Sequence, residues 1–178
     1  RLNVRYYKYG VHMSENNDDL KGIGGWLILV ALGVVFSPIR LLAMFIPIYK
    51  PIFEDGTWEA LTTVGSEAYL PSLSFLLIGE IAFNSAMVLA SLYLIYLFFS
   101  KHYFFPKLYI ALIAVSLIFI PLDAWFVSEI FPNEPMFDQE TTKEFMRTLI
   151  AAVIWVPYML VSKRVKATFV ENMPNKSF

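Results

Sequence analysis

The stretch SFLLIGEIAFNSAMVLASLYLIYLFF, residues Ser74–Phe99, decides the fold of this chain. Its single charged residue is Glu80, and apart from a few small polar side chains the rest is apolar. About 20 apolar residues, at a rise of 1.5 Å each, are enough to cross the hydrocarbon core of a bilayer. Ser74–Phe99 exceeds that length, so it predicts a membrane-spanning helix.

This helix is expected to have two specialised faces. Glu80 and Asn84 share a polar face, because residues spaced by three or four lie above one another on a helix. Ala82, Ala86 and Ala90 form a ridge of small residues on the opposite face, a pattern that lets transmembrane helices approach closely. Neither face is suited to lipid, so we expect this helix to lie at the centre of a bundle.

The composition of the whole chain is that of a membrane protein. Of its 178 residues, 57% are hydrophobic, and the mean hydropathy is +0.57. There is no cysteine, and both histidines, His12 and His102, lie outside the apolar stretches, so no intramembrane metal site of these ligands can form. Nucleotide-binding and hydrolase motifs are absent, and the net charge of −1 gives no support to nucleic-acid binding. We therefore predict no catalytic residue, no cofactor and no metal, and expect that the protein is not an enzyme.

Four apolar stretches predict an all-α integral membrane protein, a four-helix transmembrane bundle with spans at residues 25–46, 74–99, 108–127 and 145–162. The membrane domain then covers residues 25–162, between an N-terminal tail of residues 1–24 and a basic tail of residues 163–178. Before the fourth span, Thr141 and Glu144 have the spacing of a capping box, which predicts that a helix begins there.

The first residues leave two interpretations open. Met13 begins a segment, MSENNDDLKG, that is typical of a protein N-terminus. Residues 1–12 are then a non-native or upstream extension. The alternative is a short basic surface tail.

The distribution of basic residues predicts the orientation. Most of the 14 Lys and Arg residues fall on the side of both termini and of the turn at residues 100–107, whereas the other two loops are acidic. By the positive-inside rule, we expect both termini to lie in the cytoplasm.

The loop between spans one and two, residues 47–73, begins at Pro47. Within it, apolar residues recur at helical spacing: Trp58, Leu61, Val64, Ala68 and Tyr69. This periodicity predicts a short amphipathic helix lying on the extracytoplasmic membrane surface. A disordered loop is the alternative.

Ionisable residues inside the first three spans lie at similar predicted depth, in the outer half of the bilayer: Arg40, Glu80 and Asp123. An unpaired charge at that depth costs a few kcal/mol. We therefore predict a buried cluster in which Arg40 pairs with Glu80, Asp123 or both, and Asn84 completes the hydrogen bonding. Further candidates for this cluster are Ser37, Arg147 as a second partner of Asp123, and Trp155.

Both groups of charges have two interpretations. The cluster is either a binding site or proton relay open to the outside, or an ion-pair network that fixes the order of the helices. After span four, Lys163, Arg164 and Lys166 either contact anionic lipid headgroups or act as a plain topogenic signal.

Short motifs give the chain a family resemblance. GGWL at Gly24–Leu27, S-P-x-R at Ser37–Arg40 and WVPYMLVSKRVKATF at Trp155–Phe169 resemble the YdgK-like proteins, small four-span bacterial inner-membrane proteins grouped as a domain of unknown function. The resemblance covers roughly residues 22–170, and its most specific part is S-x-R-V-K-x-T-F at Ser162–Phe169. It implies a bacterial inner-membrane location but supplies no activity and no catalytic residue.

Two functional hypotheses follow. The first is a non-enzymatic accessory component that binds other inner-membrane proteins, or a second copy of itself, through the alanine ridge and the basic tail. The second is a small transporter, or a solute- or proton-binding protein, that uses the Arg40, Glu80 and Asp123 cluster from the extracytoplasmic side. An outward-open polar cavity at the cluster favours transport, whereas a closed ion pair beside an exposed ridge favours association.

Overall fold

The computed structural model describes residues 20–173, and within that range the regular structure is helical. The helices in that range that are long and apolar enough to cross a membrane are α2 (Trp26–Glu54), α4 (Pro71–Phe99), α5 (Phe105–Ile130) and α6 (Gln139–Val161). Two short helices are also present, α3 (Thr57–Thr62) and α7 (Lys163–Thr168). The prediction of a helical protein with four candidate spans is confirmed. The prediction about residues 1–12 lies outside the described residues.

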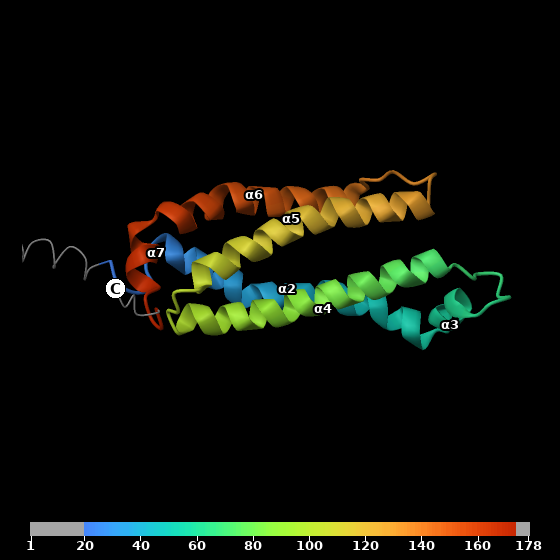
Figure 1. The fold of residues 1–178 in the computed structure, drawn as a ribbon, viewed down its shortest axis with the longest axis horizontal. Coiled ribbons are helices and arrows are strands. Elements are labelled where there is room, and N and C mark those ends of the chain that lie inside the picture. Colours follow the sequence, from blue (N-terminus) through green and yellow to red (C-terminus); the bar gives the residue numbers. More distant parts are fainter. Residues whose placement is uncertain (1–19, 174–178) are drawn as a thin grey trace, which may run out of the picture.

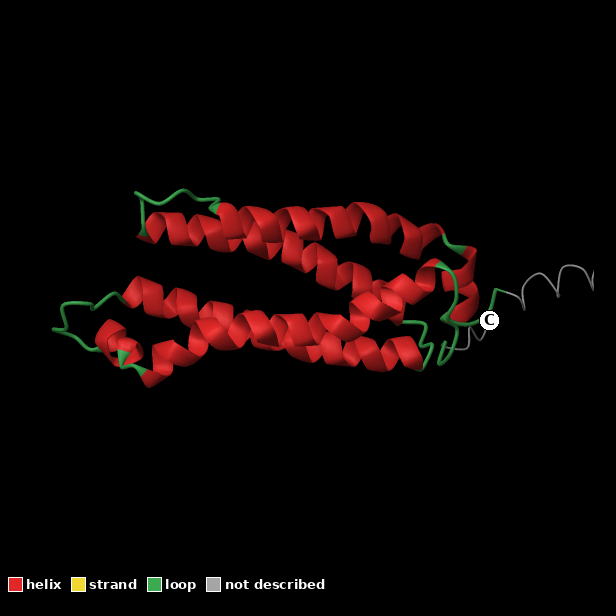
Figure 2. Cartoon of the chain, turned by 180° about the vertical axis from the view of Figure 1, so that it is seen from behind, coloured by secondary structure: helices red, strands yellow, loops and turns green. Residues whose placement is uncertain are grey.

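The long helices form two antiparallel pairs, α2 with α4 and α5 with α6 (Figure 1). α4 also packs against α5, to which the short turn at residues 100–104 joins it. The two pairs are close together at this turn and diverge toward the long loops (Figure 2). The end that carries the 100–104 turn is here called the turn end, and the opposite one the loop end.

Most of the apolar surface of the long helices points away from the protein. In the most apolar window of each helix, 22% of the residues are buried inside the protein in α2 and α4, and 6% in α5 and α6. A soluble monomer does not expose apolar surface on this scale. Lipid tails are the surroundings that suit such helices, whose backbone hydrogen bonds are satisfied internally.

The main core lies at the turn end. The Phe169 ring stacks on Phe105 with centroids 4.5 Å apart, and Phe98 meets Phe105 edge-on at 5.0 Å. Phe98 and Phe105 are fully buried, because the short turn brings the end of α4 and the start of α5 together. The other buried members of this core are Leu27, Val30, Val34, Leu94, Leu97, Met159 and Val165. All the long helices therefore contribute to one core at this end.

α7 lies across the turn end (Figure 1) and ties the first described residues to the last. The buried Thr168 hydroxyl accepts a hydrogen bond from the Gly22 amide and donates to the Gly22 carbonyl, both at 3.1 Å. Backbone hydrogen bonds also join Glu171 to Lys101 and to Tyr103, at 3.2 and 3.1 Å. The turn end is therefore a hydrogen-bonded base for the bundle.

The loop predicted to begin at Pro47 begins later. α2 continues through Pro47 and Pro51, although each proline removes a backbone hydrogen bond inside the helix. Packing offsets that loss, because Tyr49 is buried in a second small core with Leu61 of α3 and Leu77 of α4. The helix of the first predicted span therefore runs past Pro47, because tertiary contacts outweigh the local effect of proline here.

A short helix, α3, forms in this loop, but it covers only the first part of the periodicity that predicts an amphipathic helix. Leu61 is buried, and Trp58 packs against the small core between α2 and α4. Val64 is 80% exposed and Tyr69 is 40% exposed, so the rest of the predicted apolar face does not pack on the protein. Gly65 turns the chain after α3 with a φ of +94°, a left-handed conformation that favours glycine and does not continue a helix.

α6 begins before the predicted capping box. Asp138 is its N-cap, and the Asp138 carboxylate accepts a hydrogen bond from the Thr141 amide at 2.7 Å. Hydrogen bonds from Thr141 hold the pKa of Asp138 below its usual value. The predicted box is wrong because Glu144, its second member, binds arginine side chains instead of the cap.

Candidate functional site

Arg40 of α2 pairs with Glu144 of α6, so the predicted pairing with Glu80 or Asp123 is wrong. The Arg40 Nη2 donates to both carboxylate oxygens of Glu144, at 2.5 and 2.8 Å. Glu144 also accepts a hydrogen bond from Arg147 on the same helix, at 2.7 Å. The prediction placed Arg40 near the end of a shorter span; because α2 is longer, Arg40 lies about 21 Å from its loop end.

Glu80 of α4 is bound by a tyrosine instead. The Tyr49 hydroxyl donates to Glu80 Oε2 at 2.5 Å, and Tyr49 is 7% exposed. Asn84 lies one turn further along α4, and its Nδ2 donates to the Glu80 backbone carbonyl at 2.9 Å. Asn84 therefore bonds to its own helix and interacts with Tyr49, and it forms no hydrogen bond with the Arg40 guanidinium.

Asp123 of α5 faces the same region from the other helix pair. It lies within electrostatic reach of Glu80 and Tyr49, and both carboxyl groups are half-buried. Within residues 20–173, neither carboxylate forms an ion pair with a Lys or Arg side chain. Glu80 and Asp123, called the acidic pair below, are oxygen ligands of the kind that hold a proton or a small cation.

None of the further candidates is bound to the acidic pair. Arg147 pairs with Glu144 rather than with Asp123. Trp155 packs against the main core, with its ring 5.9 Å from that of Tyr158. Ser37 makes no side-chain hydrogen bond in the described part of the chain.

The alanine ridge of α4 is largely open on the surface. Ala82 and Ala86 are exposed, and Ala90 is half-buried. Gly79 continues the ridge toward the loop end: it is exposed, and a Cβ placed on it would meet nothing within 4 Å. The described chain itself therefore leaves a face of small residues without a packing partner.

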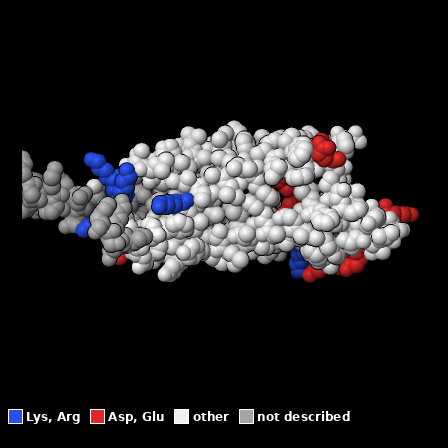
Figure 3. All heavy atoms as spheres, viewed as in Figure 1, with Lys and Arg blue, Asp and Glu red and all other residues white. Residues whose placement is uncertain are grey.

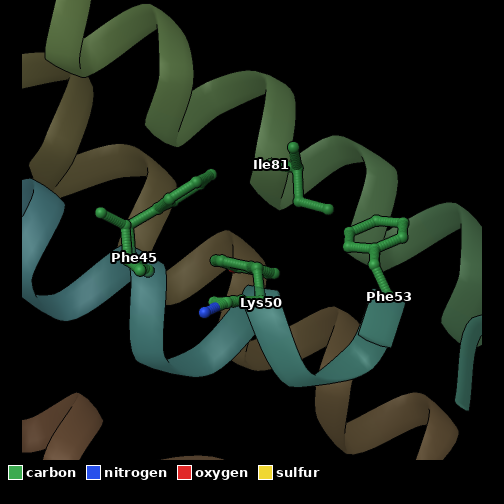
Figure 4. Close-up of a pocket in the computed structure, with 6 residues that line it drawn as sticks. Phe45, Lys50, Phe53 and Ile81 are labelled. Atoms are coloured by element: carbon green, nitrogen blue, oxygen red, sulfur yellow. The ribbon is translucent and has the colours of Figure 1, made fainter. Parts of the chain in front are cut away.

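A shallow hollow of about 270 Å³ lies between α2 and α4 at the loop end. Phe45 and Phe53 of α2 flank it, and Ile81 faces them from α4 (Figure 4). Tyr49, Ile46 and Lys50 complete its lining. The hollow is open and mainly apolar, so it is not the polar cavity that a transporter would need at the acidic pair.

Basic and acidic residues are separated along the bundle. Figure 3 shows most of the visible Lys and Arg atoms at the turn end and most of the Asp and Glu atoms toward the loop end. On α7, Lys163 and Lys166 are exposed, whereas Arg164 is half-buried. The Arg164 guanidinium lies so close to Gly24 that a Cβ there would be 2.9 Å from Nη1. Arg164 therefore faces the protein, and its two lysine neighbours face outward.

Sequence reasoning missed Tyr49 and Glu144. Tyr49 falls in the region predicted as a loop after Pro47, and nothing in the sequence marks it as a partner of Glu80. Glu144 carries a usable signal, because it precedes Arg147 by three residues, the spacing of an intrahelical ion pair.

Comparison with known proteins assigns a family. A family model described as "Protein of unknown function (DUF2569)" matches residues 20–170. The chain is 29% identical over 156 residues to the inner membrane protein YdgK of Escherichia coli (strain K12). The aligned region covers 83% of this chain and 93% of YdgK. No solved structure matches it. Since the family match runs from before α2 to beyond α7, the chain belongs to the DUF2569 family of proteins of unknown function.

Proposed function

We propose that this chain is a non-enzymatic inner-membrane protein that works by helix association, with α4 as the contact helix. The observation that carries the proposal is the exposed ridge of Gly79, Ala82 and Ala86. Small residues at this spacing let two helices approach closely in lipid, where van der Waals contact drives association. The partner we propose is a second copy of the chain.

The open face of α4 extends beyond the ridge. Exposed residues follow one another at alternating spacings of four and three, and we call them the α4 seam: Phe75, Gly79, Ala82, Ala86, Leu89, Tyr93 and Tyr96. This is the heptad spacing of helices that cross at a shallow angle and pack along their length. An apolar seam of this kind matches another helix in shape as well as in polarity.

A second copy of the chain fits the seam. Copies inserted in the same orientation place their α4 helices parallel. Gly79, Ala82 and Ala86 would then face their own counterparts, so small residues meet small residues along the closest part of the contact. A two-fold axis along the membrane normal lets the same patch serve both partners.

Replacing both exposed alanines tests this proposal. Ala82→Leu with Ala86→Leu fills the close contact and is expected to weaken dimerisation in lipid vesicles at least tenfold, measured by energy transfer between labelled copies. The matched control is Ala111→Leu with Ala114→Leu, which changes exposed alanines of α5. A monomer at every protein-to-lipid ratio would overturn the proposal, as would equal loss in the control.

We also propose that both termini face the cytoplasm and that α3 is extracytoplasmic. The basic side chains at the turn end and the acidic loops support this orientation through the positive-inside rule. Because the chain has no cysteine of its own, labelling of a single introduced cysteine reports directly on which side of the membrane that position lies. In intact spheroplasts, a membrane-impermeant thiol reagent is expected to label Glu67→Cys and to label Lys166→Cys only after lysis. The reverse labelling pattern would refute this orientation.

A second candidate function, proton or cation binding, is favoured by the acidic pair. Two half-buried carboxyl groups, one on α4 and one on α5, lie within electrostatic reach of one another, and a tyrosine hydroxyl donates a hydrogen bond to one of them. Under this proposal Asp123 and Glu80 bind a proton or cation that enters from the loop end.

A stability measurement tests this second candidate. The thermal midpoint of the purified protein is expected to rise with added Na⁺ or Ca²⁺, because a ligand that binds the folded state stabilises it. Asp123→Asn is expected to abolish the rise, whereas Glu129→Gln, an exposed acid on the same helix, retains it. Equal responses of all three proteins, or no response across the pH range, would rule the candidate out.

A further inference from the structure

We propose that the outward face of α7 binds the headgroups of anionic phospholipids, with Lys163 and Lys166 as the residues that contact the phosphate. This proposal is independent of the α4 seam and of the acidic pair. It rests on how α7 is packed, on the charges around it and on the end of the bundle at which it lies.

Packing determines which way α7 faces. Val165, Thr168 and Phe169 are 1%, 2% and 3% exposed, so this side of the helix is turned into the protein. At 100° per residue, Lys163 and Lys166 fall on the opposite side, and both are exposed. α7 therefore presents two lysines outward from a buried apolar face.

Several contacts hold α7 in this position. The Ser162 hydroxyl caps the helix by accepting a hydrogen bond from the Val165 amide at 3.3 Å. The Thr168 hydroxyl is hydrogen-bonded to the Gly22 backbone, and the Phe169 ring is stacked on that of Phe105. Because the helix is already ordered, binding a headgroup costs less conformational entropy than it would for a flexible basic tail.

Aromatic residues at the same end indicate the level of the membrane surface. Trp26, at the start of α2, is 64% exposed, and Tyr96, near the end of α4, is 61% exposed. Exposed Trp and Tyr side chains are enriched at the headgroup level of membranes. α7 lies across the turn end (Figure 1), the end at which α2 begins and α4 ends, so its lysines are expected near the lipid phosphates.

The charges at the turn end suit an anionic partner. Within residues 20–173, neither Lys163 nor Lys166 is paired with a carboxylate. Lys101 and Lys107 belong to the same end, where the Lys107 ammonium lies 5.8 Å from the Tyr103 ring centroid. Figure 3 shows that basic atoms predominate there. The two lysines of α7 are therefore available to a phosphate and lie in a positive field.

The test uses the folded, purified full chain, so that any role of the lysines in membrane insertion is already complete. Native mass spectrometry in a neutral detergent measures the binding of added phosphatidylglycerol and of phosphatidylcholine. Wild-type protein is expected to bind phosphatidylglycerol more tightly. Lys163→Gln with Lys166→Gln is expected to weaken that binding about 30-fold, since each basic residue near the surface contributes about 1 kcal/mol. Lys163→Arg with Lys166→Arg should bind like the wild type.

The matched control changes two exposed lysines near the loop end, Lys50→Gln with Lys143→Gln, and is expected to leave phosphatidylglycerol binding unchanged. Equal binding by the α7 glutamine variant overturns the proposal, and so does an equal loss in the control. If the double glutamine variant does not fold, the single variants give the same comparison with a smaller expected loss. Glycerol phosphate is added as a competitor: competition as effective as that of the lipid would assign the site to free phosphate and refute the lipid proposal.

Discussion

Arg40 of α2 donates to both carboxylate oxygens of Glu144 on α6, and this ion pair joins the two helix pairs away from the core at the turn end. Glu144 is shared, because Arg147 binds the same carboxylate from its own helix. Inside a membrane, a charge that loses its partner costs about 2.5–3.5 kcal/mol. The bridge therefore matters more to this protein than a similar pair on a soluble surface, where the contribution is about 0–1 kcal/mol.

Glu144→Gln is expected to lower the free energy of unfolding by about 2–3 kcal/mol, because it leaves two guanidinium groups without a carboxylate. Arg147→Gln should cost less, since the bond between Arg40 and Glu144 remains. Glu140→Gln, an exposed acid near the start of α6, is the matched control and should change stability by less than about 0.5 kcal/mol.

The measurement is a double-mutant cycle on purified protein unfolded with a denaturing detergent. The effects of Arg40→Gln and Glu144→Gln should not add, because each removes the same bond, whereas those of Arg40→Gln and Glu80→Gln should add. Additivity in the first cycle and coupling in the second would show that Arg40 pairs with Glu80 instead.

Tyr49→Phe is expected to destabilise the protein by about 1–3 kcal/mol, because it leaves the Glu80 carboxylate without its hydrogen-bond donor. The change keeps the ring, so the packing of Tyr49 with Leu61 and Leu77 is preserved. Thermal unfolding of the purified protein measures the loss. Tyr69→Phe removes an exposed hydroxyl and should be neutral; if both variants unfold alike, the bond to Glu80 contributes nothing.

Thr168→Val is expected to open the contact between α7 and the segment before α2. Valine has the shape of threonine but cannot bind Gly22, so the Gly22 amide loses its partner at a cost of about 1–3 kcal/mol. Hydrogen exchange should report faster exchange at Gly22 while the Val165 amide, capped by Ser162, stays protected. Thr63→Val, at an exposed position, is the control, and unchanged exchange at Gly22 in the Thr168 variant would contradict the contact.

The N-cap of α6 gives the protein a pH-dependent contribution with a definite sign. Hydrogen bonds from Thr141 lower the pKa of Asp138 in the folded state, so the carboxylate stabilises the fold above its unfolded value of about 4. This stabilisation is lost as the pH falls through the lowered folded pKa. The difference in thermal midpoint between wild type and Asp138→Ala should therefore be constant from neutral pH to about pH 5 and should shrink in more acidic buffer.

Asp138→Asn is the control for this pH effect, because asparagine also caps helices but carries no titratable carboxyl group. The difference between Asp138→Asn and Asp138→Ala should not depend on pH. A wild-type advantage that persists unchanged at the lowest pH would refute the assignment to Asp138.

The sequence by itself determined the number and kind of the long helices. A run such as Ser74–Phe99 has one stable solution in lipid, a helix that satisfies its own backbone hydrogen bonds, so its length and polarity are enough to identify it. Ala82 and Ala86 were also recognisable as candidates, because spacing alone decides which residues share a helical face. Lys163 and Lys166 were recognised together with Arg164 as a basic segment, and the structure separates the outward lysines from the arginine.

Only the tertiary structure decided which side chains meet. Whether α2 stops at Pro47 depends on the packing of Tyr49 against α3 and α4, and that packing puts a tyrosine rather than Arg40 beside Glu80. Arg40 instead pairs with Glu144, a residue about a hundred positions later in the chain. Composition and periodicity describe one helix at a time. A hydrogen bond between helices depends on where each helix ends and on how the two helix pairs are placed. Packing energy determines both the helix ends and the placement of the pairs.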